Sequence, residues 1–150
     1  MNMTRSERET VDVRDGYASF LSELNLFSIS LIRSSCRVNR EEYLSDGEAH
    51  VNYKLSNKSM DVEEHHFDVC STLNLKVSTE KTKALQLWVS ATFELHFHGA
   101  PPLDPKYIKR FCESEIKLIS WPYFREYVSN LSSRMHIPPF TLPLQNNESK

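Results

Sequence analysis

The chain has 150 residues, with 18 Lys and Arg against 20 Asp and Glu and a formal net charge of −2. That balance leaves no basic footprint for a nucleic-acid partner or an anionic membrane surface. The length predicts a single domain over residues 1–150, with a mobile segment at 1–14 and a short polar tail at 145–150. We find neither a secretory signal nor an apolar run long enough to cross a bilayer, so no membrane contact is expected.

The cysteines and glycines argue against an enzyme. Cys36, Cys70 and Cys112 are odd in number, widely spaced and without a C-x-x-C pair. This favours reduced core thiols in a cytoplasmic protein over a disulfide framework or a zinc site. Only three glycines occur, and the sequence contains no phosphate-binding loop and no nucleophile elbow. We therefore expect no catalytic residues and no cofactor.

The first elements along the chain are a helix and an irregular strand. Apolar residues at helical spacing from Tyr17 to Phe27 predict a short amphipathic helix over residues 16–27. Residues 28–39 then alternate as a strand, with a slip of phase near Ile32 that indicates a bulge. A polar loop is expected over residues 41–48, although it carries Tyr43 and Leu44.

Three segments with a period of two follow. Alternating apolar residues predict strands over 50–56, 67–78 and 85–98, each with one buried and one wet face. The connections at 57–66 and 79–84 suit hairpins, so the four strands are expected to form an antiparallel meander. Its single apolar face needs a cover from another element.

The last third of the chain supplies that cover. Asp104 is a good N-cap with Pro105 at the first helical position, and helical spacing of apolar residues continues to Met135. Ser120-Trp121-Pro122 predicts a kink in this helix. His136 and Ile137 are expected to end it ahead of Pro138-Pro139, and 140–144 follow as an extended, proline-bounded segment. The predicted fold class is α+β: a four-stranded antiparallel sheet, a short N-terminal helix and a long, Pro-kinked C-terminal helix.

This long helix carries more aromatic residues than one sheet can cover. They are Tyr107, Phe111, Trp121, Tyr123, Phe124 and Tyr127. Because one sheet buries only one stripe of a helix, we expect the surplus face to meet another subunit or a ligand.

Residues 119–144, ISWPYFREYVSNLSSRMHIPPFTLPL, carry a specific motif. An aromatic-Pro-Tyr-x-Arg-Glu run is followed by Ser-Arg and then by a proline-led apolar segment. The motif positions are Trp121, Pro122, Tyr123, Arg125, Glu126, Ser133, Arg134, Pro139, Phe140 and Leu142. This stretch resembles the corresponding helix of the SecB-type export chaperones.

The resemblance implies a SecB-like fold whose long helices pair between subunits in a homotetramer, a dimer of dimers. It also implies an ATP-independent holdase that binds unfolded or aggregation-prone polypeptides in apolar grooves, for protein export or for control of a toxin–antitoxin pair. The expected client-binding residues are Phe27, Tyr43, Leu44, Trp88, Trp121, Phe124, Phe140, Leu142 and Leu144. The residues expected to hold the helix and the assembly are Trp121, Pro122, Tyr123, Arg125, Glu126, Tyr127 and Arg134.

Several of these residues also suit a purely structural role. Phe124 fits a core position better than a groove, whereas Tyr43, Leu44 and Phe140 fit either. Arg125 and Arg134 are expected to cap, pair or pack within the helix and its exit, and not to touch a client.

The chain departs from the export-dedicated SecB pattern in three ways. It stops soon after the proline-rich segment, where those proteins continue into a further helix and a polar tail that help engage the SecA motor. The helix at 16–27 is more similar to SecB-like chaperones that protect an antitoxin. The acidic sheet face through which the family meets SecA reduces here to Asp68 and Glu94. The client and the partnership with SecA therefore stay open.

Two other functions remain as alternatives. A partner-specific adaptor on the same scaffold would recognise one folded protein through a sheet edge. A small metal-dependent enzyme would use His96 and His98 on one strand face, with Glu94 or His50 as a further ligand. A solvated polar face is the simpler interpretation of these histidines, so we expect no metal.

Overall fold

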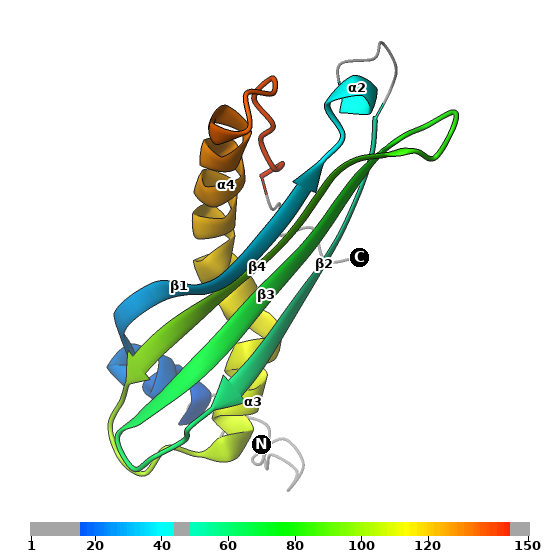
Figure 1. The fold of residues 1–150 in the computed structure, drawn as a ribbon. Helices are drawn as coiled ribbons and strands as arrows, with labels where there is room; N and C mark the ends of the chain where they lie inside the picture. The colour runs from blue at the N-terminus through cyan, green and yellow to red at the C-terminus, as the bar shows by residue number, and fades with distance from the viewer. Residues whose placement is uncertain (1–15, 44–48, 145–150) are drawn as a thin grey trace, which may run out of the picture.

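The computed structural model describes residues 16–43 and 49–144 and is organised around one antiparallel sheet. Its strands, β1 (Asn25–Val38), β2 (Ala49–Met60), β3 (His66–Thr79) and β4 (Leu85–His98), lie in the order β1-β4-β3-β2. The long C-terminal helices are α3 (Pro105–Ser114) and α4 (Ile116–Arg134). Figure 1 shows both on one side of the sheet, which leaves the other face uncovered. The predicted α+β class is confirmed.

The observed bounds of the central strands agree with those predicted from the sequence, whereas the bounds of the edge strands differ from the prediction. β4 has the predicted bounds, but β2 runs on to Met60 because β3 offers pairing partners as far as Asp68. Residues 25–27, predicted as helical, belong to β1, since Leu26 pairs opposite Phe97 and the helical residues end at 23. The register shift between Leu31 and Arg33 confirms the bulge predicted near Ile32.

The strand order corrects the predicted meander. β1 lies next to β4, at the opposite edge of the sheet from β2. The β2–β3 and β3–β4 connections are short and make their strands neighbours, whereas the longer β1–β2 connection carries the chain across the sheet. That connection contains a short helix, α2 (Arg40–Tyr43), where a loop was predicted. Its remaining residues, 44–48, lie outside the described part, as do 1–14 and 145–150.

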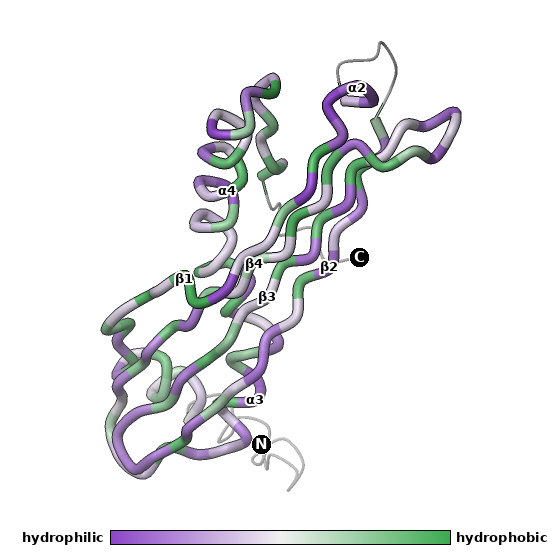
Figure 2. The backbone as a smooth tube through the Cα atoms, viewed as in Figure 1, coloured by the Kyte–Doolittle hydropathy of each residue, from purple (hydrophilic) through white to green (hydrophobic). Residues whose placement is uncertain are grey.

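The core lies between the inner face of the sheet and the two helices. Apolar and polar residues alternate along the strands, as Figure 2 shows. The sheet contributes Phe67, Val69, Leu73, Leu75, Val77, Leu87, Val89, Phe93, Leu95 and Phe97, all buried. The helices contribute Ile108, Phe111, Ile116, Trp121, Phe124 and Val128. Burial of each of these side chains stabilises the fold by roughly 1.5–3 kcal/mol before the loss of conformational entropy.

The long helix is interrupted earlier than predicted. The backbone N–H of Lys106 donates to Asp104 Oδ1 at 2.8 Å, so the expected N-cap of α3 is confirmed. The break falls at Glu115, between α3 and α4, and Pro122 lies inside α4. A proline there removes one helical hydrogen bond. The helix continues through it because the adjoining Trp121 and Phe124 are held in the core.

Some of the aromatic residues of the long helix that the sheet does not cover are packed against another segment of the same chain. Tyr17, in the helical segment 16–23, lies 5.7 Å from Tyr107, and Phe20 lies 6.2 Å from Phe111, measured between ring centroids. This corrects the expectation that the whole surplus face meets another subunit or a ligand. Of the six aromatic side chains of α3 and α4, Tyr123 alone is exposed.

The cysteines differ from one another in environment. Cys112 is buried, and this burial, together with the charge of Glu113, raises its pKa to about 11. Cys70 is half-buried and Cys36 is exposed, so the expectation of core thiols is wrong for Cys36. Its place on the edge strand β1 explains the exposure. Among the helices of the described residues, none is both long and apolar enough to cross a membrane.

Replacing Phe124 with Ala should lower the free energy of unfolding by about 3–5 kcal/mol. Its fully buried ring meets Phe93 edge-on at 5.0 Å, so truncation leaves a cavity. The matched control is Tyr123→Ala at the neighbouring, exposed position, where a loss of about 1 kcal/mol or less is expected. Urea denaturation measures both, and equal losses would contradict the placement of Phe124 in the core.

Candidate functional site

The extended segment after α4 folds back along that helix. His136 has a φ of 54°, in the left-handed region, and the chain reverses there. Figure 1 shows residues 135–144 returning beside α4. Trp121 Nε1 donates to the Pro143 carbonyl at 2.8 Å, and Arg125 Nε donates to the Leu142 carbonyl at 2.8 Å. These bonds leave Leu142 fully buried, so the segment is part of the protomer's own packing.

We call the hydrogen bonds of Trp121 to Pro143 and of Arg125 to Leu142 the clamp. Some motif residues of α4 belong to the clamp, and others lie on the surface of the helix. Trp121 and Arg125 hold the C-terminal segment, as described above. The rings of Tyr123 and Tyr127 lie 6.2 and 6.3 Å from that of Phe93 on β4. Pro122, Glu126 and Arg134 are exposed. Their role in an assembly therefore stays a prediction.

The expected client-binding residues do not come together in one groove. Trp121, Phe124 and Leu142 are buried inside the protomer, so an incoming chain cannot reach them there. Phe27 and Trp88 lie on the face of the sheet opposite the helices. The others are Tyr43 and Phe140, which are half-buried, Leu144, which is 71% exposed, and Leu44, which is outside the described residues.

One exposed apolar surface lies at the β2 edge of the sheet, on the helix side. Val51 and Tyr53 are exposed there, and the Tyr53 ring lies 5.1 Å from Trp121. Leu144 follows Pro143, whose carbonyl is bound to that same indole. We call Val51, Tyr53 and Leu144 the β2 patch. It combines apolar side chains with the backbone edge of a strand, the two features that an extended chain needs for binding.

A second apolar surface lies at the opposite edge. Helix α4 packs on β2, β3 and β4 and contacts the edge strand β1 less. Leu26, Leu31 and Ile32 are exposed as a result, with Ile32 at the bulge 52% exposed. We call these three residues the β1 strip. An apolar edge strand of this length is a template for pairing with another chain.

Sequence reasoning missed both edges. It assigned Val51 and Tyr53 to a buried strand face, because a period of two does not distinguish an edge strand from a central one. The charged Lys54 and Lys58 within β2 were a hint, since lysine is common on edge strands. In β1, Arg33, Arg37 and the bulge predicted near Ile32 were comparable hints.

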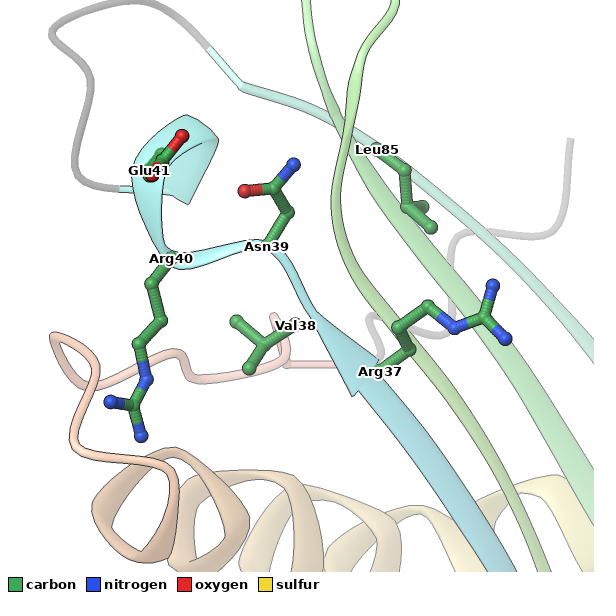
Figure 3. Close-up of a pocket in the computed structure, with 6 residues that line it drawn as sticks. All are labelled: Arg37, Val38, Asn39, Arg40, Glu41 and Leu85. Atoms are coloured by element: carbon green, nitrogen blue, oxygen red, sulfur yellow. The ribbon is translucent and has the colours of Figure 1, made fainter.

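Helix α2 bridges the end of β1 and the C-terminal segment. The Tyr43 hydroxyl donates to the Pro138 carbonyl at 3.2 Å, and the Arg40 guanidinium donates to the Met135 carbonyl at 3.1 Å. Burial raises the pKa of Tyr43, so its phenol remains a protonated donor at neutral pH. Beside α2 lies an open hollow of about 540 Å³. Figure 3 shows its lining residues Arg37, Val38, Asn39, Arg40, Glu41 and Leu85, with the two arginines directed to different sides.

The histidines form hydrogen bonds with one another and with Asp68. His96 Nδ1 contacts the Asp68 carboxylate, and its Nε2 lies 3.1 Å from that of His98. His50, considered as a further ligand, is at the other end of the sheet, where it pairs opposite Ser78. Over residues 16–43 and 49–144, no group of three or more His, Cys, Asp or Glu side chains is placed to hold a metal ion. The metal-enzyme alternative therefore gains no support from this part of the chain.

Comparison with known proteins places the fold. No protein-family model matches the chain, and no curated protein sequence matches it. Among solved structures, it is similar to the Mycobacterium tuberculosis SecB-like chaperone Rv1957 in complex with a ChAD peptide from the HigA1 antitoxin. The TM-score is 0.69 at 20% identity, covering 88% of this chain and 97% of that chain. The chain has the SecB-like fold.

A second solved structure is less similar to the chain. A protein of unknown function from Streptococcus agalactiae gives a TM-score of 0.47 at 11% identity, covering 81% of this chain and 98% of that chain. Within the described residues, the β2 patch and the β1 strip are exposed apolar surfaces at the two edges of the sheet.

Replacing Trp121 with Phe should lower the free energy of unfolding by about 1 kcal/mol, because it removes the N–H that holds the Pro143 carbonyl. The control is Trp88→Phe, since the Trp88 indole N–H forms no hydrogen bond within the described residues. Guanidinium titrations followed by far-UV circular dichroism measure both variants. If the two substitutions cost the same, the clamp does not contribute as described.

Proposed function

We propose that this protein is an ATP-independent holdase that binds unfolded or aggregation-prone polypeptides. The supporting observation is the similarity, over 88% of the chain, to a SecB-like chaperone that is itself in complex with an antitoxin peptide. The client class is an unfolded antitoxin or an unfolded export precursor. SecA would be a further partner in the export case. The protein works in the cytoplasm and requires no cofactor.

The chemistry of the β2 edge suits such clients. An unfolded chain offers apolar side chains together with unpaired backbone N–H and C=O groups. Among residues 16–43 and 49–144, β2 has one neighbouring strand, β3, and no strand of these residues pairs with its other edge. Val51, Tyr53 and Leu144 add apolar contact that does not depend on one exact client sequence. In this proposal the β2 patch is the client site.

The β1 edge has a different role in the proposal. Its exposed apolar residues are covered by a second copy of the chain, and pairs of such dimers form a homotetramer. A self-complementary strand edge is a natural two-fold contact, because antiparallel pairing of identical strands is symmetric. Tyr123, exposed on α4 beside Phe93, extends this surface to the helix.

A partner-specific adaptor is the second candidate. The observation that favours it is the C-terminal segment, which is bonded to the Trp121 indole and buries its own Leu142, and so reduces the apolar area open to varied clients. An adaptor would recognise one folded protein through a sheet edge. A panel of unrelated unfolded clients distinguishes the two, since a holdase binds several of them and an adaptor binds one.

Changing Val51 to Asp should weaken suppression of client aggregation, so that about tenfold more protein is needed for the same effect. A buried carboxylate at the β2 patch opposes contact with apolar client side chains. Light scattering after dilution of an unfolded client, without ATP, is the measurement. The control is Val62→Asp, a valine in the β2–β3 connection that is 48% exposed against 39% for Val51. If Val51→Asp suppresses aggregation as well as the control does, the β2 patch is not the client site.

Changing Leu31 to Asp should lower the mass of the assembly, because it places a charge on the β1 strip where a second copy pairs. Size-exclusion chromatography with light scattering gives the mass. Val62→Asp again serves as the control and should keep the parent mass. An unchanged mass for Leu31→Asp would contradict the assignment of this edge to self-association.

A further inference from the structure

The uncovered face of the sheet carries a row of polar and aromatic side chains across all four strands. Arg37 on β1 pairs opposite Trp88 on β4, Trp88 pairs opposite Lys76 on β3, and Lys76 pairs opposite Asn52 on β2. Residues paired in this way project to the same side of a sheet. Here that side is the one without helices (Figure 1).

Two adjoining hollows flank the Trp88 indole. The first, of about 260 Å³, is lined by Arg37, Lys76, Leu85 and Trp88. The second, of about 300 Å³, is lined by Asn52, Lys54, Asn74, Lys76 and Trp88. We call these seven residues the Trp88 platform. The hollows share Trp88 and Lys76, so the indole stands as a ridge between two shallow sites on one surface.

The Trp88 platform presents hydrogen-bond donors and positive charge. The side chains of Arg37, Lys54, Lys76 and Trp88 only donate hydrogen bonds, and the two asparagine amides can donate as well. None of the three cations forms an ion pair with a carboxylate of the described residues. A ligand for this surface must therefore supply negatively charged acceptors.

Among the described residues, Asp68 and Glu94 on the same face lie away from the platform, whereas Glu41 lines the neighbouring hollow together with Arg37 and Leu85. Asp68 pairs opposite His96, and Glu94 pairs opposite Cys70, both toward the far ends of these strands. On the two central strands, the positive surface is thus bounded by carboxylates at one end, while Arg33 and Lys58 continue it on the edge strands. This favours a short anionic ligand over a long polyanion such as a nucleic acid, which would continue over Asp68 and Glu94. A single indole also provides only one stacking site for bases.

We propose that the Trp88 platform docks an acidic, extended polypeptide segment that carries apolar side chains. Its carboxylates pair with Arg37, Lys54 and Lys76, and one apolar side chain enters the hollow between Leu85 and the Trp88 ring. This surface lies on the other face of the sheet from the β2 patch. The proposal goes beyond the holdase function and does not depend on it, because a partner can dock here while a client occupies the edge.

The direct test uses a short synthetic peptide of alternating Glu and Phe with a fluorescent label, added to the full-length protein. Its twin has Gln in place of every Glu, and an oligothymidylate of similar length is the third probe. Fluorescence anisotropy should show binding of the acidic peptide that weakens as salt is raised, and at least tenfold weaker binding of the other two probes. Equal binding of the twin, or tighter binding of the oligothymidylate, would overturn the proposal.

Variants assign the binding to this surface. K54E/K76E should weaken binding of the acidic peptide by at least about tenfold, and K54Q/K76Q should weaken it less. The control K109E/K117E makes the same charge change on exposed lysines of α3 and α4 and should bind like the parent. Trp88→Ala should weaken binding at high salt as well, since it removes the apolar contact. Circular dichroism confirms that each variant is folded. If K54E/K76E and the control weaken peptide binding equally, the peptide does not bind at the Trp88 platform.

Discussion

The crossing of the chain from β1 to the opposite edge of the sheet is the constraint on which the exposed surfaces depend. A meander would leave β1 beside β2 and place a different strand at one edge. The observed order instead puts β1 and β2, the two strands with the most exposed apolar side chains, at the two edges. Helices α3 and α4 then cover the central strands and leave both edges accessible. The strand order therefore places both exposed edges that the proposed function uses: the β1 strip for self-association and the β2 patch for a client.

The C-terminal segment adds a second constraint. Its carbonyl groups would be unpaired after the helix ends, and the Trp121 indole and the Arg125 guanidinium satisfy two of them. The same contacts bury Leu142 and tie α2 to the segment through Tyr43 and Pro138. Trp121, Arg125 and Leu142, which belong to the sequence motif, thus complete the packing of the protomer. In the proposed function, the client surface lies further out, at Tyr53 and Leu144.

Much of this architecture could be predicted because its determinants are local. The alternation in β3 and β4 and the Asp104-Pro105 helix start depend on residues close in sequence, and they are confirmed. The strand order could not be predicted, since it depends on how a long connection packs. Phe27 illustrates the same limit: its spacing fits a helix, yet pairing of the adjacent Leu26 with Phe97 on β4 makes it part of a strand. The interruption predicted at Pro122 was wrong, because core packing of Trp121 and Phe124 outweighs the effect of the proline, and nothing local in the sequence marks the break that falls at Glu115 instead.

The functional surfaces were harder to predict than the fold, because exposure is a property of the whole structure. Trp121 and Phe124 were expected to line a binding groove, but both are buried in the core. Val51 was expected to be buried, but it is exposed. The most direct test of the account is amide hydrogen exchange of the full chain, with and without a saturating unfolded client. The account predicts that client slows exchange in β2 while the amides of β3 and β4 exchange as before. Unchanged exchange in β2, with slower exchange confined to another surface, would contradict it.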